Sequence, residues 1–227
     1  MTCAVVTGGG RGVGRAVALA LAARGHDVAL LARTASELEQ TAAEIAALGR
    51  RALAIRCDVT RPSDVTRAAD SVGSSLGAVE VVVNNAGIVR RALVHQMKEE
   101  DWDAVVAVNL KGPFLVTRVF LPSMLERKKG RVVMVGSISS TLGTAAQSAY
   151  CAAKWGVVGF TKSLAEELRG TGLQAMCVMP GSVATTMLDG SGFLPQMTPE
   201  DVARLVAYAA LDAPDAMNGS AIEMFGP

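Results

Sequence analysis

This chain of 227 residues has few histidines, a small net charge and no long apolar run. With only two histidines, His26 and His95, a histidine-based metal site is not expected. A formal net charge of +1 creates no global field that would recruit nucleic acid or an anionic membrane. The apolar run Ala16–Ala23 falls far short of the roughly 20 residues that span a bilayer. We therefore predict no metal, no nucleic acid and no membrane as partners.

The four cysteines are scattered, and none has the CxxC spacing of a metal or redox site. Cys3, Cys57 and Cys177 lie in apolar, strand-like runs, so we expect reduced thiols in the core. The first of these runs begins at Cys3, which leaves no room for a signal peptide. Together these features predict a cytoplasmic protein.

Strand-like and helix-like segments alternate along the chain. The seven expected strands are Cys3–Val6, Val28–Ala32, Ala52–Cys57, Val79–Val83, Arg131–Val135, Gln174–Met179 and Ala221–Met224. Helices are expected over residues 13–24, 36–48, 63–71, 102–127, 150–168 and 199–211. This order predicts a single-domain α/β protein over residues 1–227. We expect a Rossmann fold with a doubly wound, parallel, seven-stranded sheet and helices on both faces. Ligands of such sheets bind at the carboxyl ends of the strands.

Several helix ends carry capping signals. Ser36 and Glu39 have the spacing of a capping box, and Ser63 is placed to open the following helix. Thr198 precedes Pro199 at the start of the last helix. The least regular stretch is 187–197, which we interpret as a mobile flap or as a disordered loop.

A glycine-rich turn, Thr7–Gly14, follows the first strand. A dinucleotide pyrophosphate is an anion that binds main-chain N–H groups at a helix N-terminus, and a Cβ there would block its approach. Gly8, Gly12 and Gly14 supply the turn, the approach and the close contact between helix and strand. Their spacing is not that of the GxGxxG fingerprint, so an ordinary glycine-rich loop is the alternative interpretation.

The end of the second strand indicates which dinucleotide is bound. An acidic residue there would hold a ribose 2′-OH and repel a 2′-phosphate, but this chain has Ala32 followed by Arg33. Arg11 lies in the glycine turn, and guanidinium groups bind phosphate bidentately. We therefore predict NADP(H) as the cofactor; the alternative is that both arginines are ordinary solvated side chains.

These residues, combined with several downstream motifs, resemble the short-chain dehydrogenase/reductase family. The resemblance covers nearly the whole chain and rests on Thr7–Gly14, Asp58-Val59, Asn84-Asn85-Ala86-Gly87, Asn109, Ser137, Tyr150-x-x-x-Lys154 and Pro180-Gly181 with Thr185. It implies an NADP-dependent oxidoreductase that interconverts a carbonyl and an alcohol.

The chemistry of this reaction fits three of the matched residues. Reducing a ketone puts negative charge on its oxygen, so an acid must donate a proton there and a second donor should hold the oxygen. A tyrosine pKa of about 10 is too high for this, and a nearby ammonium lowers it. Positions i and i+4 share a helix face, so Tyr150 and Lys154 can point into one cleft. We predict Tyr150 as general acid/base, Lys154 as the group that lowers its pKa, and Ser137 as the donor that holds the carbonyl oxygen.

Other residues of the same types are poorer candidates. Ser139 and Ser140 lie in the same loop as Ser137, but only Ser137 stands at the family's distance of thirteen residues before the tyrosine. Tyr208 has Asp212 at its i+4 position and cannot replace Tyr150.

The resemblance assigns further roles. Lys154 would also bind the nicotinamide ribose, and Asn109 would anchor a water of the proton relay, although alone it reads as a polar residue inside a helix. Asp58 and Val59 would meet the adenine, with a solvated strand end as the alternative for Asp58. Val183 and Thr185 would clamp the carboxamide. The full set of implied cofactor contacts is Thr7, Gly8, Gly10, Arg11, Gly12, Val13, Gly14, Arg33, Asp58, Val59, Asn85, Ala86, Gly87, Tyr150, Lys154, Pro180, Gly181, Val183 and Thr185.

Within the family, residues 84–90, 97–110 and 135–150 look most like 3-oxoacyl-[acyl-carrier-protein] reductases. This implies a 3-oxoacyl thioester-like substrate or a broad range of carbonyls. A sugar, polyol or other secondary-alcohol dehydrogenase is one alternative, and a non-catalytic NADP-binding regulator is another. The segment 186–198 is shorter than is usual in the family, which suggests an open cleft.

Two kinds of macromolecular partner are also implied. An acidic carrier protein could meet the basic cluster of residues 127–131, which reads equally well as a solvated helix end. The family resemblance further implies a homo-oligomer, a dimer or a tetramer, packed through the helices around 110–125 and 150–168.

Overall fold

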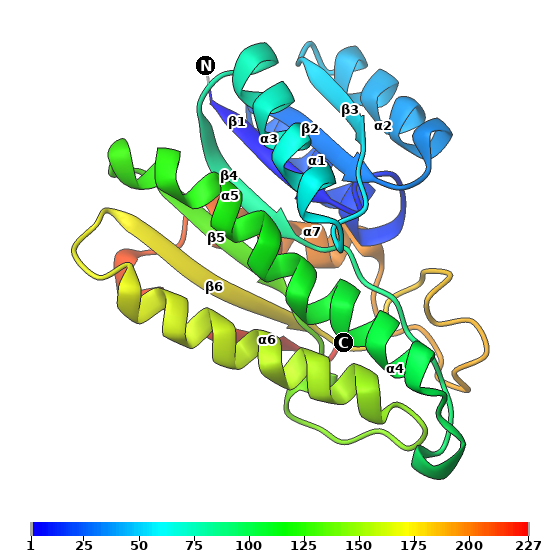
Figure 1. The fold of residues 1–227 in the computed structure, drawn as a ribbon. Coiled ribbons are helices and arrows are strands. Elements are labelled where there is room, and N and C mark those ends of the chain that lie inside the picture. The colour runs from blue at the N-terminus through cyan, green and yellow to red at the C-terminus, as the bar shows by residue number, and fades with distance from the viewer. Residues whose placement is uncertain (1, 227) are drawn as a thin grey trace.

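The computed structural model describes residues 2–226; residues 1 and 227 of the predicted domain lie outside that range. Seven parallel strands form one sheet in the order β3-β2-β1-β4-β5-β6-β7 (Figure 1). The strands are β1 Cys3–Thr7, β2 Asp27–Ala32, β3 Ala52–Arg56, β4 Val79–Asn84, β5 Gly130–Val135, β6 Leu173–Pro180 and β7 Ala221–Met224. The predicted doubly wound sheet is therefore confirmed. Its strand order reverses between β1 and β4, where ligands of such sheets bind.

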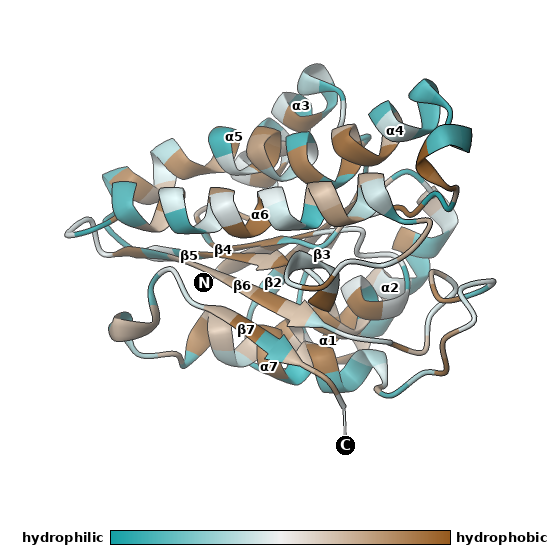
Figure 2. Cartoon of the chain, turned by 90° about the horizontal axis from the view of Figure 1, so that it is seen from below, coloured by the Kyte–Doolittle hydropathy of each residue, from teal (hydrophilic) through white to brown (hydrophobic). Residues whose placement is uncertain are grey.

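Helices cover both faces of the sheet. Figure 2 shows α3, α4, α5 and α6 on one side and α1, α2 and α7 on the other. The helices are α1 Gly12–Ala23, α2 Ala35–Ala47, α3 Pro62–Ser75, α4 Glu99–Val106, α5 Gly112–Glu126, α6 Ser148–Glu167 and α7 Pro199–Leu211. Because both faces are covered, the central strands read as nearly continuous apolar runs; all eight residues of β6 are buried.

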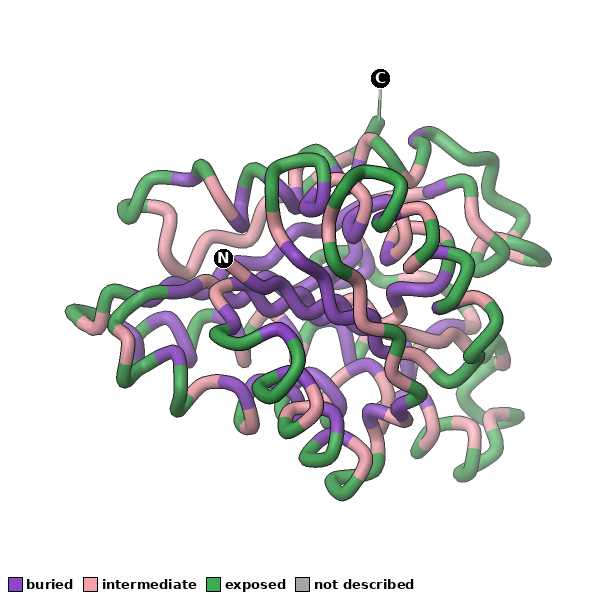
Figure 3. Tube along the Cα trace, turned by 90° about the horizontal axis from the view of Figure 1, so that it is seen from above, coloured by how far each residue is buried: buried purple, intermediate pink, exposed green. Residues whose placement is uncertain are grey.

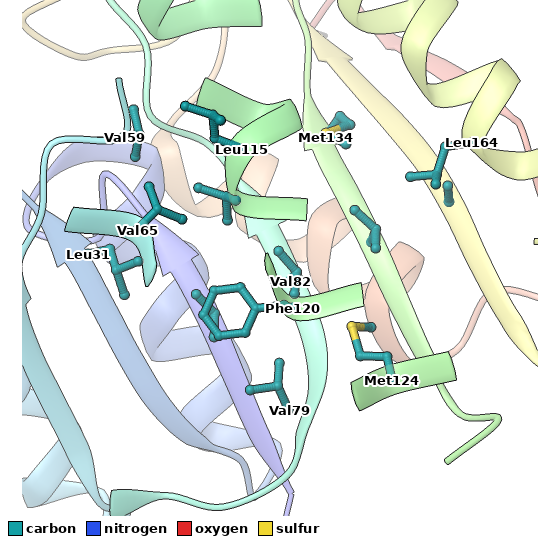
Figure 4. Packing of buried hydrophobic residues seen from close by; sticks show 14 of the residues in the cluster. Leu31, Val59, Val65, Val79, Val82, Leu115, Phe120, Met124, Met134 and Leu164 are labelled. Carbon is teal, nitrogen blue, oxygen red and sulfur yellow. The ribbon is translucent and has the colours of Figure 1, made fainter. Parts of the chain in front are cut away.

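Two hydrophobic clusters, one on each face, hold the layers together. On the face covered by α5, Phe120 and Met124 pack against Val79 and Val82 of β4 (Figure 4). Figure 3 shows burial concentrated in the strands, with exposed residues on the outer helix faces and loops. This packing fixes the carboxyl ends of the strands, on which the site is built.

The expected core thiols are confirmed. Cys3, Cys57 and Cys177 are buried and free. Burial raises the pKa of Cys3 to about 12 and those of Cys57 and Cys177 to about 11. Such thiols stay protonated at neutral pH and are therefore poor nucleophiles.

The helix expected from residue 102 to 127 differs from the prediction. It begins at Glu99 and contains a π-helical turn, η2 Ala107–Lys111, between α4 and α5. By length and composition alone, the helical segment 99–126 is long and apolar enough to cross a membrane. Within its most apolar stretch of 18 residues, 44% is buried inside the protein. It lies over β4 and β5, as helices that cover a core sheet do.

The capping predictions had mixed outcomes. Thr198 and Asp201 exchange main-chain to side-chain hydrogen bonds at the start of α7, so that cap is confirmed. The Ser36 capping box was wrong, because α2 begins at Ala35 after an extended Thr34 and has no side-chain cap. The prediction for Ser63 was also wrong: α3 begins at Pro62, whose fixed φ suits the first helical position.

Candidate active site

A cleft of about 1260 Å³ runs along the carboxyl ends of the strands. Its walls are the glycine turn, the ends of β2, β4, β5 and β6, the start of α6 and the segment 182–195. Every residue that the sequence analysis proposed for the site lines this cleft except Thr7 and Asn109. Motifs up to 177 positions apart in the sequence (Gly8 to Thr185) thus meet in one place.

The glycine turn is shaped by the absence of side chains. Gly8 and Gly12 have φ values of +66° and +51°, a region that favours glycine. A Cβ on Gly14 would overlap the Gly8 carbonyl oxygen. A Cβ on Gly12 would lie 3.2 Å from Cγ2 of Thr185, which belongs to the opposite wall. The turn therefore exposes main-chain N–H groups at the start of α1, under the base of the 182–197 segment.

Thr7 and Asn85 brace this turn from behind. The Thr7 hydroxyl accepts hydrogen bonds from the main-chain N–H groups of Asn85 and Ala86, at 2.9 and 3.0 Å. The Asn85 side chain donates to the Thr7 carbonyl at 2.9 Å. Thr7 is buried, so it supports the cofactor wall from inside and does not face the cleft.

At the far end of the cleft, Arg33 follows β2 with an exposed side chain that has no salt bridge within residues 2–226. Arg11 lies 3.5 Å from the carboxylate of Glu37, which also lines the cleft. The carboxylate of Asp58 accepts two hydrogen bonds from Thr60 and so shapes the turn after β3. No local sequence pattern indicates Glu37 as a site residue, because its approach to Arg11 depends on how α2 packs against the glycine turn.

Ser137 sits at the end of β5 and caps a short 3₁₀ turn, η3 Ile138–Ser140. Its Oγ accepts a hydrogen bond from the main-chain N–H of Ser139 at 3.1 Å. Its own N–H donates to Oγ of Ser140 at 3.3 Å. The hydroxyl hydrogen of Ser137 is thereby left to donate into the cleft. Ser139 and Ser140, which the sequence analysis set aside, position Ser137.

Tyr150 and Lys154 lie on one face of α6, and both are more than nine-tenths buried. The Lys154 Nζ stands 5.7 Å from the centre of the tyrosine ring and donates to the Val135 carbonyl at 2.7 Å. Burial lowers the pKa of Lys154 to about 8. The other tyrosine, Tyr208, lies partly exposed on α7, and its hydroxyl donates a hydrogen bond to the sulfur of Met217.

The expectation that Lys154 lowers the tyrosine pKa stays a prediction. The Lys154 ammonium donates one of its three protons to the Val135 carbonyl. Burial raises the pKa of Tyr150 above its ordinary value, and hydrogen bonding to Ser137 opposes that rise. The phenol is therefore protonated at neutral pH, which is the state that an acid donating to a substrate oxygen requires.

Asn109 occupies the middle of the π-helical turn, behind the cleft wall. Its amide donates to the carbonyls of Ile88 and Val105, at 2.8 and 2.9 Å. Its Oδ1 is buried and has no hydrogen-bond partner within residues 2–226. A π turn of this kind often marks a functional position, and a buried carbonyl oxygen calls for a donor.

The opposite end of the cleft is built by three loops that the sequence analysis did not assign in detail. They are the segment 85–98, the turn 138–147 and the flap, defined here as residues 182–197. In Figure 1 the flap is the gold loop beside the segment that leads from β4 to α4. Arg91 joins these two segments by donating to the carbonyls of Met187 and Asp189, at 2.9 and 3.1 Å.

The flap has an ordered base. A bridge pairs Val183 with Met197, and the N–H of Ala184 donates to the Met197 carbonyl at 2.9 Å. At the end of β6, the N–H of Gly181 donates to the Met224 carbonyl at 2.8 Å. The two interpretations given to residues 187–197, a mobile flap or a disordered loop, both stay predictions.

The basic cluster 127–131 lies at the amino-terminal edge of the sheet, away from the cleft of its own chain. Arg131 donates to the carbonyls of Ala209 and Ala213 at the end of α7, and Arg127 donates to the Val79 carbonyl. These contacts give the two arginines a structural task at helix and strand ends, which differs from the solvated helix end that was the alternative interpretation.

Known proteins share this sequence and this fold. The family model described as short chain dehydrogenase matches residues 2–192. The chain is 38% identical to a 3-oxoacyl-[acyl-carrier-protein] reductase of Synechocystis sp., over 92% of this chain and 89% of that protein. It is 35% identical to 2-(S)-hydroxypropyl-CoM dehydrogenase 3 of Xanthobacter autotrophicus, over 97% and 94% of the two chains.

A solved structure agrees with these matches. A short-chain type dehydrogenase/reductase from Mycobacterium marinum superimposes with a TM-score of 0.94 at 32% identity, covering 99% of this chain and 94% of that one. The fold and the cleft define an oxidoreductase. The chain belongs to the short-chain dehydrogenase/reductase family.

Proposed function

We propose that this protein uses NADPH to reduce a ketone or aldehyde carbonyl to an alcohol, in a reversible reaction. One observation carries the proposal: Ser137, Tyr150 and Lys154 line the same cleft as the glycine turn. A proton donor, an oxygen-binding hydroxyl and a pyrophosphate cradle are the parts that carbonyl reduction requires.

The cleft fits a dinucleotide. Gly8, Gly12 and Gly14 leave a cradle that a Cβ would fill, and the start of α1 favours an anion there. Asp58, Val59 and Asn85–Gly87 line the cleft, where the first two would meet the adenine and the others would pass beneath the adjoining ribose. Val183 and Thr185, at the flap base, would hold the carboxamide. When bound, the nicotinamide supplies the hydride.

We assign the 2′-phosphate to Arg33. Its guanidinium lines the cleft after a β2 strand that ends in Ala32, and no carboxylate pairs with it within residues 2–226. The Glu37 carboxylate, which would otherwise repel a phosphate, is offset by Arg11 at 3.5 Å. A guanidinium binds phosphate bidentately, so NADPH should be preferred over NADH.

Four residues carry the proton chemistry: Tyr150, Ser137, Lys154 and Asn109. The protonated phenol of Tyr150 donates to the oxygen that becomes the alcohol, and the Ser137 hydroxyl donates a hydrogen bond to the same oxygen. The Lys154 ammonium, present below its pKa of about 8, donates to the Val135 carbonyl and would restore the proton of the phenol through an intervening hydroxyl or water. Oδ1 of Asn109 accepts a hydrogen bond from a water that connects Lys154 with solvent.

For the substrate, we propose a 3-oxoacyl thioester or a carbonyl compound of similar shape. The similarity to 3-oxoacyl-[acyl-carrier-protein] reductases supports this, as does the apolar lining of the substrate end, where Ile88, Val89 and Phe193 lie. The second candidate substrate is a secondary alcohol. The similarity to the dehydrogenase from Xanthobacter supports it. A carrier protein remains part of the proposal as the bearer of the thioester.

We also propose a cytoplasmic homo-oligomer, a dimer or tetramer, that packs through α5 and α6. Phe114, Leu125 and Trp155 expose large apolar side chains on these helices. Burying them against a second copy would remove apolar area from water.

The test is a screen for NADPH oxidation across acyl thioesters, diketones, aldehydes and sugars. We expect the highest kcat/KM with a 3-oxo thioester and a lower value with NADH. Turnover of sugars alone would favour the polyol alternative. If the protein binds NADPH tightly but none of the tested carbonyl compounds causes NADPH oxidation, the protein would be a regulator. The proposed function would then be abandoned.

A further inference from the structure

The substrate end of the cleft contains a largely buried glutamine whose amide has no task in the fold. Gln147 lines the cleft and is 8% exposed. It is the N-cap residue of α6, yet its side chain makes no capping hydrogen bond, and no other partner for it occurs within residues 2–226. A buried polar group is normally hydrogen-bonded, so this amide is available to a ligand.

The backbone holds Gln147 firmly in place. Its N–H donates to the Thr144 carbonyl at 3.2 Å, and its carbonyl accepts from the N–H of Cys151 at 2.8 Å. The preceding residue, Ala146, has a φ of +59°, which is uncommon for a residue with a Cβ. Strain of this kind persists where the surroundings enforce it, often at functional sites. The N–H of Ala92 donates to the Ala146 carbonyl at 3.0 Å and thereby ties this turn to the 85–98 segment.

The position of Gln147 relative to the reacting groups follows from the helix. Gln147 is the residue directly before α6, three positions before Tyr150, and residues 147, 150 and 154 all line the cleft. Gln147 stands about 4.5 Å along the axis from Tyr150, since each residue rises about 1.5 Å. The residue therefore lies on the turn before Tyr150, at the end of the helix away from Lys154. A substrate held at the phenol by one oxygen can reach this amide with a second oxygen two carbons away.

We propose that Gln147 is a specificity-determining residue that hydrogen-bonds a second oxygen of the substrate, so that 3-oxo thioesters and other 1,3-dicarbonyl compounds are preferred over simple ketones. The assignment rests on the proposed carbonyl reduction and narrows its substrate class. The amide can donate through Nε2 and carries no charge, which suits a neutral carbonyl as its partner. A ketone without that carbonyl leaves the amide buried and unpaired, which is the basis of the discrimination.

The test compares two substrates of equal length, an S-ethyl 3-oxobutanoyl thioester and a straight-chain methyl ketone without the second carbonyl. In Gln147→Leu, we expect kcat/KM for the thioester to fall about tenfold to a hundredfold. For the ketone it should change by less than about threefold, because no hydrogen bond is lost. Gln147→Asn keeps the amide but shortens it, and should also lose most of the preference.

The matched control is Gln174→Leu. Gln174 is equally buried, but it lies at the other end of β6, bonded to Asp215, and should not affect the substrate ratio. NADPH binding by each variant reports that the cleft is folded. An equal loss on both substrates in Gln147→Leu overturns the assignment and leaves the proposed function standing. A wild-type protein that reduces neither compound while binding NADPH overturns both.

Discussion

The two ends of the cleft are built by different means. At the cofactor end, the glycine turn and the strand ends present main-chain groups, and the shape depends on side chains that are absent. At the substrate end, three loops present side chains such as Gln147 and Arg91, and the shape depends on hydrogen bonds between the loops. The first end is suited to a cofactor shared by a whole family, whereas the second can change with the substrate.

Tyr150 belongs to the junction of the two ends, and its removal should separate chemistry from binding. We expect Tyr150→Phe to lower kcat for carbonyl reduction by about a hundredfold to ten-thousandfold, the usual contribution of a general acid. The Kd for NADPH should stay within a factor of about three, because the variant loses one hydroxyl that the cradle does not use.

Steady-state kinetics and a fluorescence titration of NADPH measure these two effects. Tyr208→Phe is the matched control, since that tyrosine lies on α7, outside the cleft lining. If both tyrosine variants lost the same amount of activity, Tyr150 would have no special role.

Gly14→Ala should do the reverse and remove binding. The added Cβ would overlap the Gly8 carbonyl oxygen and force the turn apart. Because overpacking of this kind costs about 1–3 kcal/mol or more, we expect the Kd for NADPH to rise by about a hundredfold. Gly73→Ala is the control: a Cβ at this position in α3 meets no atom within 4 Å, and binding should not change. Unaltered NADPH affinity in Gly14→Ala would refute the role of the turn.

Arg33→Ala sharpens the comparison within the cofactor end itself. A charge-assisted hydrogen bond is worth about 1.5–3 kcal/mol, so kcat/KM with NADPH should fall about tenfold to a hundredfold. The value with NADH should hardly change, since NADH has no 2′-phosphate. The ratio of the two values is the measurement, and an equal fall with both cofactors would contradict the assignment of Arg33.

The sequence predicts the cofactor end better than the substrate end, for a physical reason. The glycine turn and the Tyr150/Lys154 pair depend on local spacing, which the sequence displays directly. Arg91 contacts two flap residues, Met187 and Asp189, which follow it by 96 and 98 positions in the sequence. No local pattern indicates such a contact. The pairing of Arg11 with Glu37 likewise depends on how α2 packs against the turn.

The details of the catalytic residues show the same limit. The spacing of Tyr150 and Lys154 predicts their shared helix face, but not that the ammonium donates to the Val135 carbonyl at 2.7 Å, nor that burial raises the pKa of the phenol. The π turn around Asn109 interrupts a segment whose sequence reads as one regular helix. Burial and main-chain acceptors from distant strands decide these features, and they exist only in the folded chain.

The central claim is that the two ends of this cleft serve one reaction, in which a hydride and the proton of Tyr150 reach the same carbonyl. Mass spectrometry of the product formed with NADPH that carries deuterium at its transferable ring position tests this most directly. The account predicts one deuterium on the carbinol carbon of the alcohol made by the wild-type protein, and about a hundredfold less labelled product per unit time from Tyr150→Phe. Alcohol that forms without the label, or equal labelling rates in both proteins, would contradict it.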